Sequence, residues 1–173
     1  MAFYVRKLSK RKSIEQIAQA DSFEDMLADA ATAEFRTTSG ALSTWEIESM
    51  EKLDEAVLAI AATSTKIERM DFIVIDREYI ERNDLICENT YAGKEIAIPD
   101  LQDTHYDIKG VTIAKLINCV RMYREIYELD NDSGQYIIRY AEREILKLLK
   151  NAQNAGRMII DLLPKDVRNV LSA

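Results

Sequence analysis

The stretch from Met70 to Asp76 constrains the fold of this chain more than any other part of the sequence. Its centre, Phe72-Ile73-Val74-Ile75, is a run of four apolar residues rich in β-branched side chains. Such a run is typical of a strand covered on both faces, because a half-exposed strand alternates apolar and polar residues instead. We therefore predict a central strand with packing partners on both sides.

The segment before this strand, residues 49–65, predicts an amphipathic helix. Apolar residues recur there at the spacing that places them on one helical face, namely Met50, Leu53, Val57, Ile60 and Ala61. Acidic residues early in the segment favour the same state, because they lie at the positive end of the helix dipole. A helix packed on the strand that follows it is the natural nucleus of a small α+β or α/β layer.

Other segments extend this nucleus into a sheet. Their patterns predict strands at 1–8, 34–38 and 42–47, and a hairpin of 85–91 with 94–98 about Ala92-Gly93. Short helices are predicted within 13–31 and a polar helical turn at 77–83, with a loop over 99–110. The predicted fold class is α+β, with α/β as the alternative: a small mixed sheet of about four to five strands with packed helices.

From Val111 onward the apolar period is helical. We predict helices over 111–127 and 138–152 and a further helical segment after Gly156, with a turn at 130–134. Residues 1–110 therefore form a mixed α+β domain built on 49–76, and residues 111–173 form a helical C-terminal segment. The apolar stripes of this segment need cover, so it packs either on the sheet or on a partner chain.

The charge of the chain is unevenly distributed. The net charge is −7, yet residues 1–12 carry five cations and no acid, and residues 13–34 carry acids and no base. A globally acidic surface repels nucleic acid and argues against binding by the whole body of the protein. It leaves open a local basic surface at the N-terminus.

This basic run supplies the candidate binding residues: Tyr4, Arg6, Lys7, Lys10, Arg11 and Lys12. One interpretation is that the cations dock on the acidic 15–34 segment of the same chain, which is the reading we favour. They are equally suited to an acidic partner. In a third interpretation they bind nucleic acid, with phosphates on the cations and a base stacked on the Tyr4 ring.

The single histidine lies between two acids, in Asp103-Thr104-His105-Tyr106-Asp107. In an extended segment, residues two apart project to the same side, so Asp103, His105 and Asp107 are candidate metal ligands or an acid/base group. A metal would need further acids from elsewhere, because the chain has no second histidine. The competing interpretation is a loop in which Thr104 and Asp107 cap the next helix and His105 makes a local hydrogen bond.

Asp71 and Asp76 bracket the predicted central strand, and together with His105 they are the candidate catalytic residues. Carboxylates at strand ends often hold metals or nucleophiles in α/β enzymes. A metal-dependent nuclease would add a second acid and a lysine on the next strand, and the sequence offers no convincing set of this kind. Acids that merely end a strand and face water are the more common case.

Several functional classes are excluded. The glycines stand alone, whereas a phosphate-binding loop needs clustered glycines, so we predict no nucleotide loop and no cofactor. Cys87 and Cys119 are far apart and lack ligand spacing, which indicates reduced thiols in a cytoplasmic protein. No apolar run approaches the roughly 18 residues of a membrane span, and no secretory leader is predicted.

These observations favour a non-enzymatic subunit or adaptor of a larger cytosolic assembly. We expect it to bind other protein chains, with further copies of itself among the candidates. The first alternative is a small metal-dependent hydrolase or nuclease that uses the strand-end and loop carboxylates. The second alternative is a nucleic-acid-binding accessory protein that uses the basic N-terminus. Both rank below the adaptor, because no catalytic constellation is paired in the sequence and the chain is acidic overall.

Overall fold

The computed structural model describes residues 2–20, 22, 25–26, 28–37, 39–90 and 95–172, and it has the predicted α+β fold. Its sheet has six strands in the order β4-β5-β2-β1-β3-β6, and each neighbouring pair is antiparallel. The strands are β1 Phe3–Lys7, β2 Leu42–Ile47, β3 Met70–Asp76, β4 Ile86–Asn89, β5 His105–Lys109 and β6 Ile137–Tyr140. The sheet is therefore antiparallel, not mixed, and larger than the sequence predicts.

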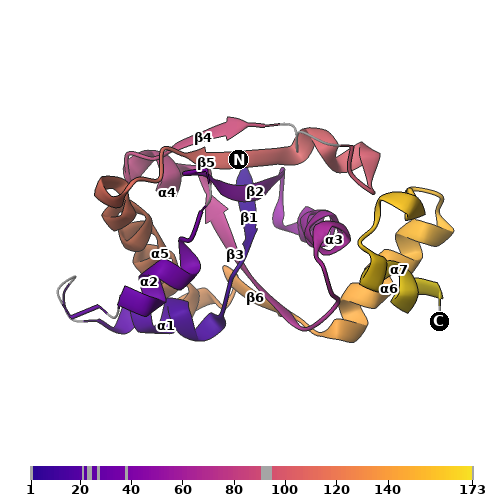
Figure 1. The fold of residues 1–173 in the computed structure, drawn as a ribbon. Coiled ribbons are helices and arrows are strands. Elements are labelled where there is room, and N and C mark those ends of the chain that lie inside the picture. The colour runs from indigo at the N-terminus through magenta and orange to yellow at the C-terminus, as the bar shows by residue number, and fades with distance from the viewer. Residues whose placement is uncertain are drawn as a thin grey trace.

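Helices cover both faces of this sheet (Figure 1). They are α1 Arg11–Gln19, α2 Ala28–Glu34, α3 Leu53–Thr63, α4 Arg77–Arg82, α5 Ile113–Ser133, α6 Glu142–Asn154 and α7 Lys165–Ser172. Helices α1, α2 and α5 lie on one side of the strands, and α3, α6 and α7 lie on the other (Figure 1). Short 3-10 segments occupy Met50–Lys52, Pro99–Thr104 and Ile160–Leu162.

Strand β3 carries the core on both of its faces, as its composition predicts. Phe72 and Val74 belong to the apolar cluster that includes α3, α6 and α7. Ile73 and Ile75 belong to the opposite cluster, which includes α1, α2 and α5. All four side chains have zero solvent exposure. The predicted helix and strand of residues 49–76 are thus confirmed as α3 and β3.

The strand register fixes which side chains lie beside one another. Val5 of β1 pairs with Trp45 of β2 and with Val74 of β3, and Trp45 pairs in turn with His105 of β5. These four residues form one row across the sheet. Since side chains alternate along a strand, each member of the row projects to the α3 side.

Two predicted segments have other structures. The hairpin of 85–91 with 94–98 does not form: β4 pairs with β5, which lies within the predicted 99–110 loop, and residues 91–94 fall outside the described part of the chain. The predicted strand at 34–38 does not form over its described part, because Glu34 ends α2 and residues 35–37 belong to no strand, and residue 38 lies outside the described part of the chain. For β4 the partner strand is distant in sequence, and short-range patterns carry no information about it.

Strand β6, Ile137–Tyr140, takes the place of the first residues of the helix predicted over 138–152. Gly134, at φ +64°, ends α5 in the left-handed conformation, which is accessible to a residue without a Cβ atom. The Asp130 carboxylate then accepts hydrogen bonds from the backbone N–H groups of Tyr136 and Ile137, at 2.7 and 2.9 Å. The chain therefore turns back directly into β6 beside β3, and the helix α6 starts only at Glu142.

The C-terminal segment is built into the same body. Helix α5 contacts α1 and buries Tyr123 and Ile126 against the sheet, β6 extends the sheet beside β3, and α6 contacts α3. Residue 110 thus separates β5 from α5, yet strands from both sides of it share one sheet. The sheet and the other helices cover the buried apolar stripes of these helices, so the stripes do not need a partner chain to cover them.

Arg157 ties the loop after α6 to two earlier elements. Its guanidinium donates to both Glu55 carboxylate oxygens, at 2.6 and 3.2 Å, and to Asp100 Oδ2 at 2.6 and 2.9 Å. The hydrogen bond to Glu55 raises the pKa of Arg157. All three side chains are at least one-third exposed to solvent, which weakens each ion pair.

Replacement of Arg157 by glutamine is expected to lower the free energy of unfolding by about 1 kcal/mol, because a solvent-screened network contributes modestly. Urea denaturation measures this difference. The matched control is Arg143→Gln, at an exposed α6 position, whose effect should stay within about 0.5 kcal/mol. Equal stabilities of the two variants would contradict a role for Arg157 in holding these elements together.

Candidate functional sites

Tyr4 does not lie at the surface. The β1 alternation places it under α5, where its side chain is 1% exposed and its hydroxyl donates to Glu46 Oε1 at 3.4 Å. Burial raises the pKa of this hydroxyl. The ring also contacts the Tyr106 ring, with centroids 5.3 Å apart. Tyr4 is therefore a core residue and cannot stack on a base, which removes one part of the predicted nucleic-acid surface.

Arg6 is engaged inside the molecule with Glu34 of α2. Its Nε lies 3.7 Å from Glu34 Oε1 without a hydrogen bond, and its two terminal nitrogens donate to the carbonyl oxygens of Ser43 and Glu34, at 3.2 and 3.1 Å. Glu34 accepts two hydrogen bonds from Ser9, at 2.9 and 2.8 Å, and one from the Tyr123 hydroxyl at 3.4 Å. Burial raises the pKa of Glu34, although Arg6 and Ser9 oppose the shift.

This pair agrees in part with the favoured sequence interpretation, in which the basic run docks on the 15–34 segment. Arg6 binds Glu34, and Arg11 lies 3.4 Å from Glu15 within α1. Lys7 makes a loose contact with Glu68 instead, at 3.9 Å. Most of the N-terminal cations thus have partners within the chain.

Lys10 and Lys12 remain at the surface, where they line a groove between α1 and α2 together with Arg36. The groove has a volume of about 790 Å³. Among the described residues, Lys10 and Lys12 form no ion pair, and Asp29 is the one acid in the lining. This groove is the local basic surface that the charge pattern predicts, reduced to two residues of the original run.

His105 makes contacts with two neighbouring strands. Its Nε2 atom lies 2.6 Å from Ser43 Oγ on β2, and its Nδ1 lies 2.5 Å from the carbonyl oxygen of Thr90, which follows β4. Asp107 Oδ1 is 4.0 Å from Nε2. The Trp45 ring packs edge-on against the imidazole, with centroids 4.9 Å apart. Ser43 is exposed, whereas the His105 side chain is 12% exposed.

The structure separates Asp103 from the other two candidate metal ligands. Asp103 belongs to the 3-10 segment and is exposed, whereas His105 and Asp107 lie two residues apart on β5 and share a face. Within the described ranges, no group of three or more His, Cys, Asp or Glu residues is close enough to hold a metal ion. The segment is therefore a strand with a preceding helical turn, not the extended loop that the sequence predicts.

Asp71 and Asp76 lie far from His105. Strand β5 is three strands away from β3, and at about 4.8 Å per strand this amounts to about 14 Å across the sheet. Asp71 pairs with Arg139 of β6 at 2.7 Å, and Asp76 accepts a hydrogen bond from the Glu78 backbone at the start of α4. Both acids thus have structural partners, and they do not converge with His105 on a common metal.

The N-terminal turns of α5 carry an apolar surface that the sequence pattern assigns to the interior. Ile113 is 93% exposed and Ile117 is 36% exposed. With α2 and the segment before it they form a groove of about 260 Å³, lined by Met26, Ala28, Ala31, Ile113, Leu116, Ile117 and Val120. Of the apolar face that helical periodicity predicts for α5, only Val120 and Tyr123 are buried, and the buried face is completed by Cys119, Met122 and Ile126.

The two cysteines are free thiols. Burial raises the pKa of Cys87 to about 12 and that of Cys119 to about 11. A thiol is nucleophilic only as its thiolate, so neither side chain is suited to nucleophilic chemistry at neutral pH.

Ser43 is the site residue that sequence reasoning missed. It lies 62 residues from His105, and it occupies a strand position where serine is unremarkable. The signal that identifies it is the β2–β5 pairing, which is a tertiary contact.

No helix in the described part of the chain is long and apolar enough to cross a bilayer. No protein-family model, no curated protein and no solved structure matches this chain.

Proposed function

We propose that the protein is a binding subunit that holds an amphipathic helix of a partner protein against α2 and α5. The exposure of Ile113, at 93%, is the observation that carries the proposal. Contact between apolar side chains and water is unfavourable. A partner that covers Ile113 and the exposed part of Ile117 would therefore lower the free energy of the complex. The groove on α5 is shaped for a few apolar anchors of such a helix.

Charge complementarity indicates the chemistry of the partner. Helix α2 lines the apolar groove with Ala28 and Ala31, and it lines the basic groove with Thr32 and Ala33, so the two grooves share this helix. A partner helix that extends from the apolar groove across α2 would approach Lys10, Lys12 and Arg36 along one edge. Acidic side chains along that edge would be attracted to them, and basic ones repelled. The partner is thus expected to have an apolar stripe flanked by acids.

The test is a double substitution, Ile113→Glu with Ile117→Glu. Charges at central apolar anchors cost about 2 kcal/mol or more, so binding of the co-purified partner should weaken by about 30-fold or more. Binding is measured by titration of the purified partner. Neither side chain belongs to the two buried apolar clusters, so the variant should fold normally.

Val170→Glu is the matched control, because Val170 is 39% exposed on α7, away from both grooves. It should bind as the wild type does. Unchanged binding by the Ile113/Ile117 variant would contradict the proposal. If the complex contains two identical chains, the groove is occupied by a second copy of this protein and not by an acidic partner.

A further inference from the structure

Ser43 and His105 have the relation of a nucleophile and its general base. A carbonyl oxygen only accepts hydrogen bonds, so the Nδ1 atom that faces Thr90 O at 2.5 Å carries the hydrogen. The neutral ring then presents the lone pair of Nε2 to Ser43 Oγ at 2.6 Å, and the serine hydroxyl donates to it. The Thr90 carbonyl thus fixes the tautomer in which His105 can take the serine proton.

Charged neighbours on the same face suit the reaction. Asp107 Oδ1, 4.0 Å from Nε2, stabilises the imidazolium that forms when the proton moves. The β1–β2 register pairs Val5 with Trp45, and continuing it by two residues would bring Lys7 of β1 across from Ser43. The Lys7 ammonium lies 3.9 Å from Glu68 Oε1, and a cation on this side of β1 would stabilise an oxyanion that develops beside Ser43.

We infer that Ser43 is an acyl-accepting nucleophile for small carboxylic esters, with His105 as its general base and Lys7 as the oxyanion stabiliser. None of the grooves described above is lined by Ser43, which is exposed on the open end of β2. The substrate is therefore an ester whose acyl carbon reaches a strand surface without a deep cleft. This activity is separate from the α2–α5 binding surface, and it requires no metal-binding group.

The chemical steps balance with water as the second substrate. Ser43 Oγ attacks the acyl carbon while its proton moves to His105 Nε2, and the tetrahedral oxyanion lies toward Lys7. Collapse of this intermediate breaks the bond to the leaving alkoxide, which takes the proton from Nε2. Water then transfers a proton to Nε2 and attacks the acyl-serine, and collapse of this second intermediate breaks the bond to Ser43 Oγ, which takes the proton back from Nε2 as the carboxylic acid is released.

The test uses 4-nitrophenyl acetate on the full-length protein. The wild type should release nitrophenol in an initial burst and carry an acetyl group on the peptide that contains Ser43, as located by mass spectrometry. Ser43→Ala should lose the burst and the adduct, whereas Ser39→Ala, at another exposed serine, should keep both. His105→Ala should slow acetylation by about 100-fold or more, the contribution typical of a general base.

Free imidazole separates a chemical role of His105 from a structural one. Added imidazole should restore part of the acetylation rate in His105→Ala, since it supplies the missing base, and it should restore none in Ser43→Ala. Circular dichroism checks that each variant is folded, and His105→Gln replaces His105→Ala if the latter is not. An acetyl adduct that is absent from Ser43 in the wild type, or that forms at the wild-type rate in the folded histidine variant, overturns the inference.

Discussion

Replacement of Arg6 by methionine is expected to lower the free energy of unfolding at neutral pH by about 3 kcal/mol, the lower end of the cost of breaking a buried ion pair. The Glu34 side chain is fully buried and that of Arg6 is 15% exposed, so water replaces the guanidinium poorly. The substitution also leaves the carbonyl oxygens of Ser43 and Glu34 without their Arg6 donors. Denaturation in urea measures the loss.

The loss should depend on pH in a defined direction. Burial raises the pKa of Glu34, so the folded chain binds this proton more tightly than the unfolded chain does. The contribution of Glu34 to stability is therefore present at acid pH and disappears as the pH rises through the folded-state pKa, above the ordinary carboxyl value. Without Arg6 the charged form is less favourable still. The deficit of Arg6→Met should thus shrink as the pH is lowered.

Two further variants distinguish this explanation from a general loss of packing. Adding Glu34→Gln to Arg6→Met removes the unpaired charge and should recover part of the stability at neutral pH. Lys12→Met, at an exposed cation of the same run, should change the stability by less than about 0.5 kcal/mol. A deficit that is independent of pH and unaffected by Glu34→Gln would contradict the proposed role of the pair.

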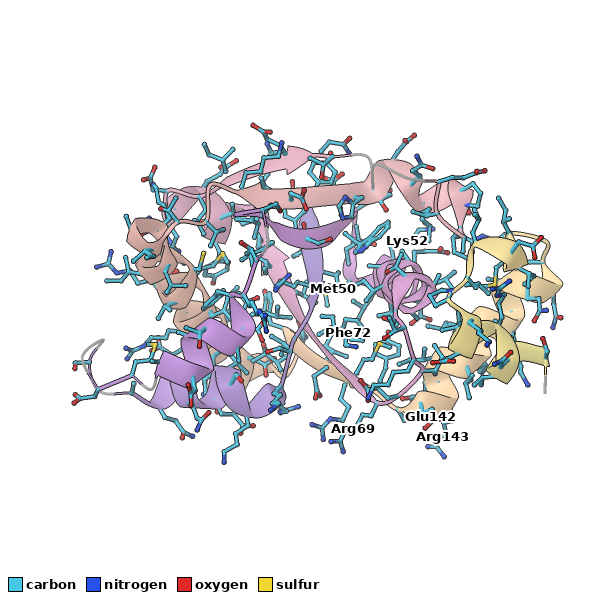
Figure 2. All side chains as sticks on the ribbon, in the orientation of Figure 1. Met50, Lys52, Arg69, Phe72, Glu142 and Arg143 are labelled. Carbon is cyan, nitrogen blue, oxygen red and sulfur yellow. The ribbon has the colours of Figure 1, made fainter. Side chains whose placement is uncertain are left out.

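Phe72→Ala is expected to have an effect of similar size, about 3–5 kcal/mol, because it removes a large side chain from a close-packed core. Phe72 has zero exposure, and its ring meets that of Tyr140 edge-on, with centroids 5.7 Å apart. Figure 2 labels it in the interior of the molecule, where it links β3 to the cluster that contains α3. Thermal and urea unfolding measure the loss.

The control for Phe72→Ala is Ile86→Ala, at a side chain that is 62% exposed on the edge strand β4. Its effect should be below about 0.5 kcal/mol, because little apolar area leaves the core. Comparable losses for the two variants would show that burial on β3 does not dominate the stability of the sheet.

The local features of the fold could be predicted because short-range patterns determine them. The composition of β3 identifies a strand covered on both faces, and the apolar stripe of residues 53–61 identifies α3. Strand β5 could not be predicted in this way. Its residues include one fully buried apolar side chain, Ile108, and it is a strand because β2 and β4 supply hydrogen bonds on both sides.

The candidate site residues also differ in whether a local sequence pattern can identify them. The sequence identifies His105 and Asp107 as candidates because the single histidine of the chain has acids two residues away. Ser43 becomes a candidate only through the β2–β5 contact. Tyr4 and Arg6 are predicted as surface binding residues because they belong to the basic N-terminal run. Helices α2 and α5 cover the face of β1 that carries them, and this cover is a tertiary arrangement that no local pattern contains.

The mass of the protein as isolated from its native cells tests the proposed binding function most directly. The apolar surface around Ile113 predicts a complex heavier than the 19.8 kDa of one chain, with an acidic partner present in a fixed ratio. The Ile113→Glu/Ile117→Glu variant should then elute as a single chain under the same conditions. A wild-type protein that elutes at 19.8 kDa with no bound partner would contradict the proposal.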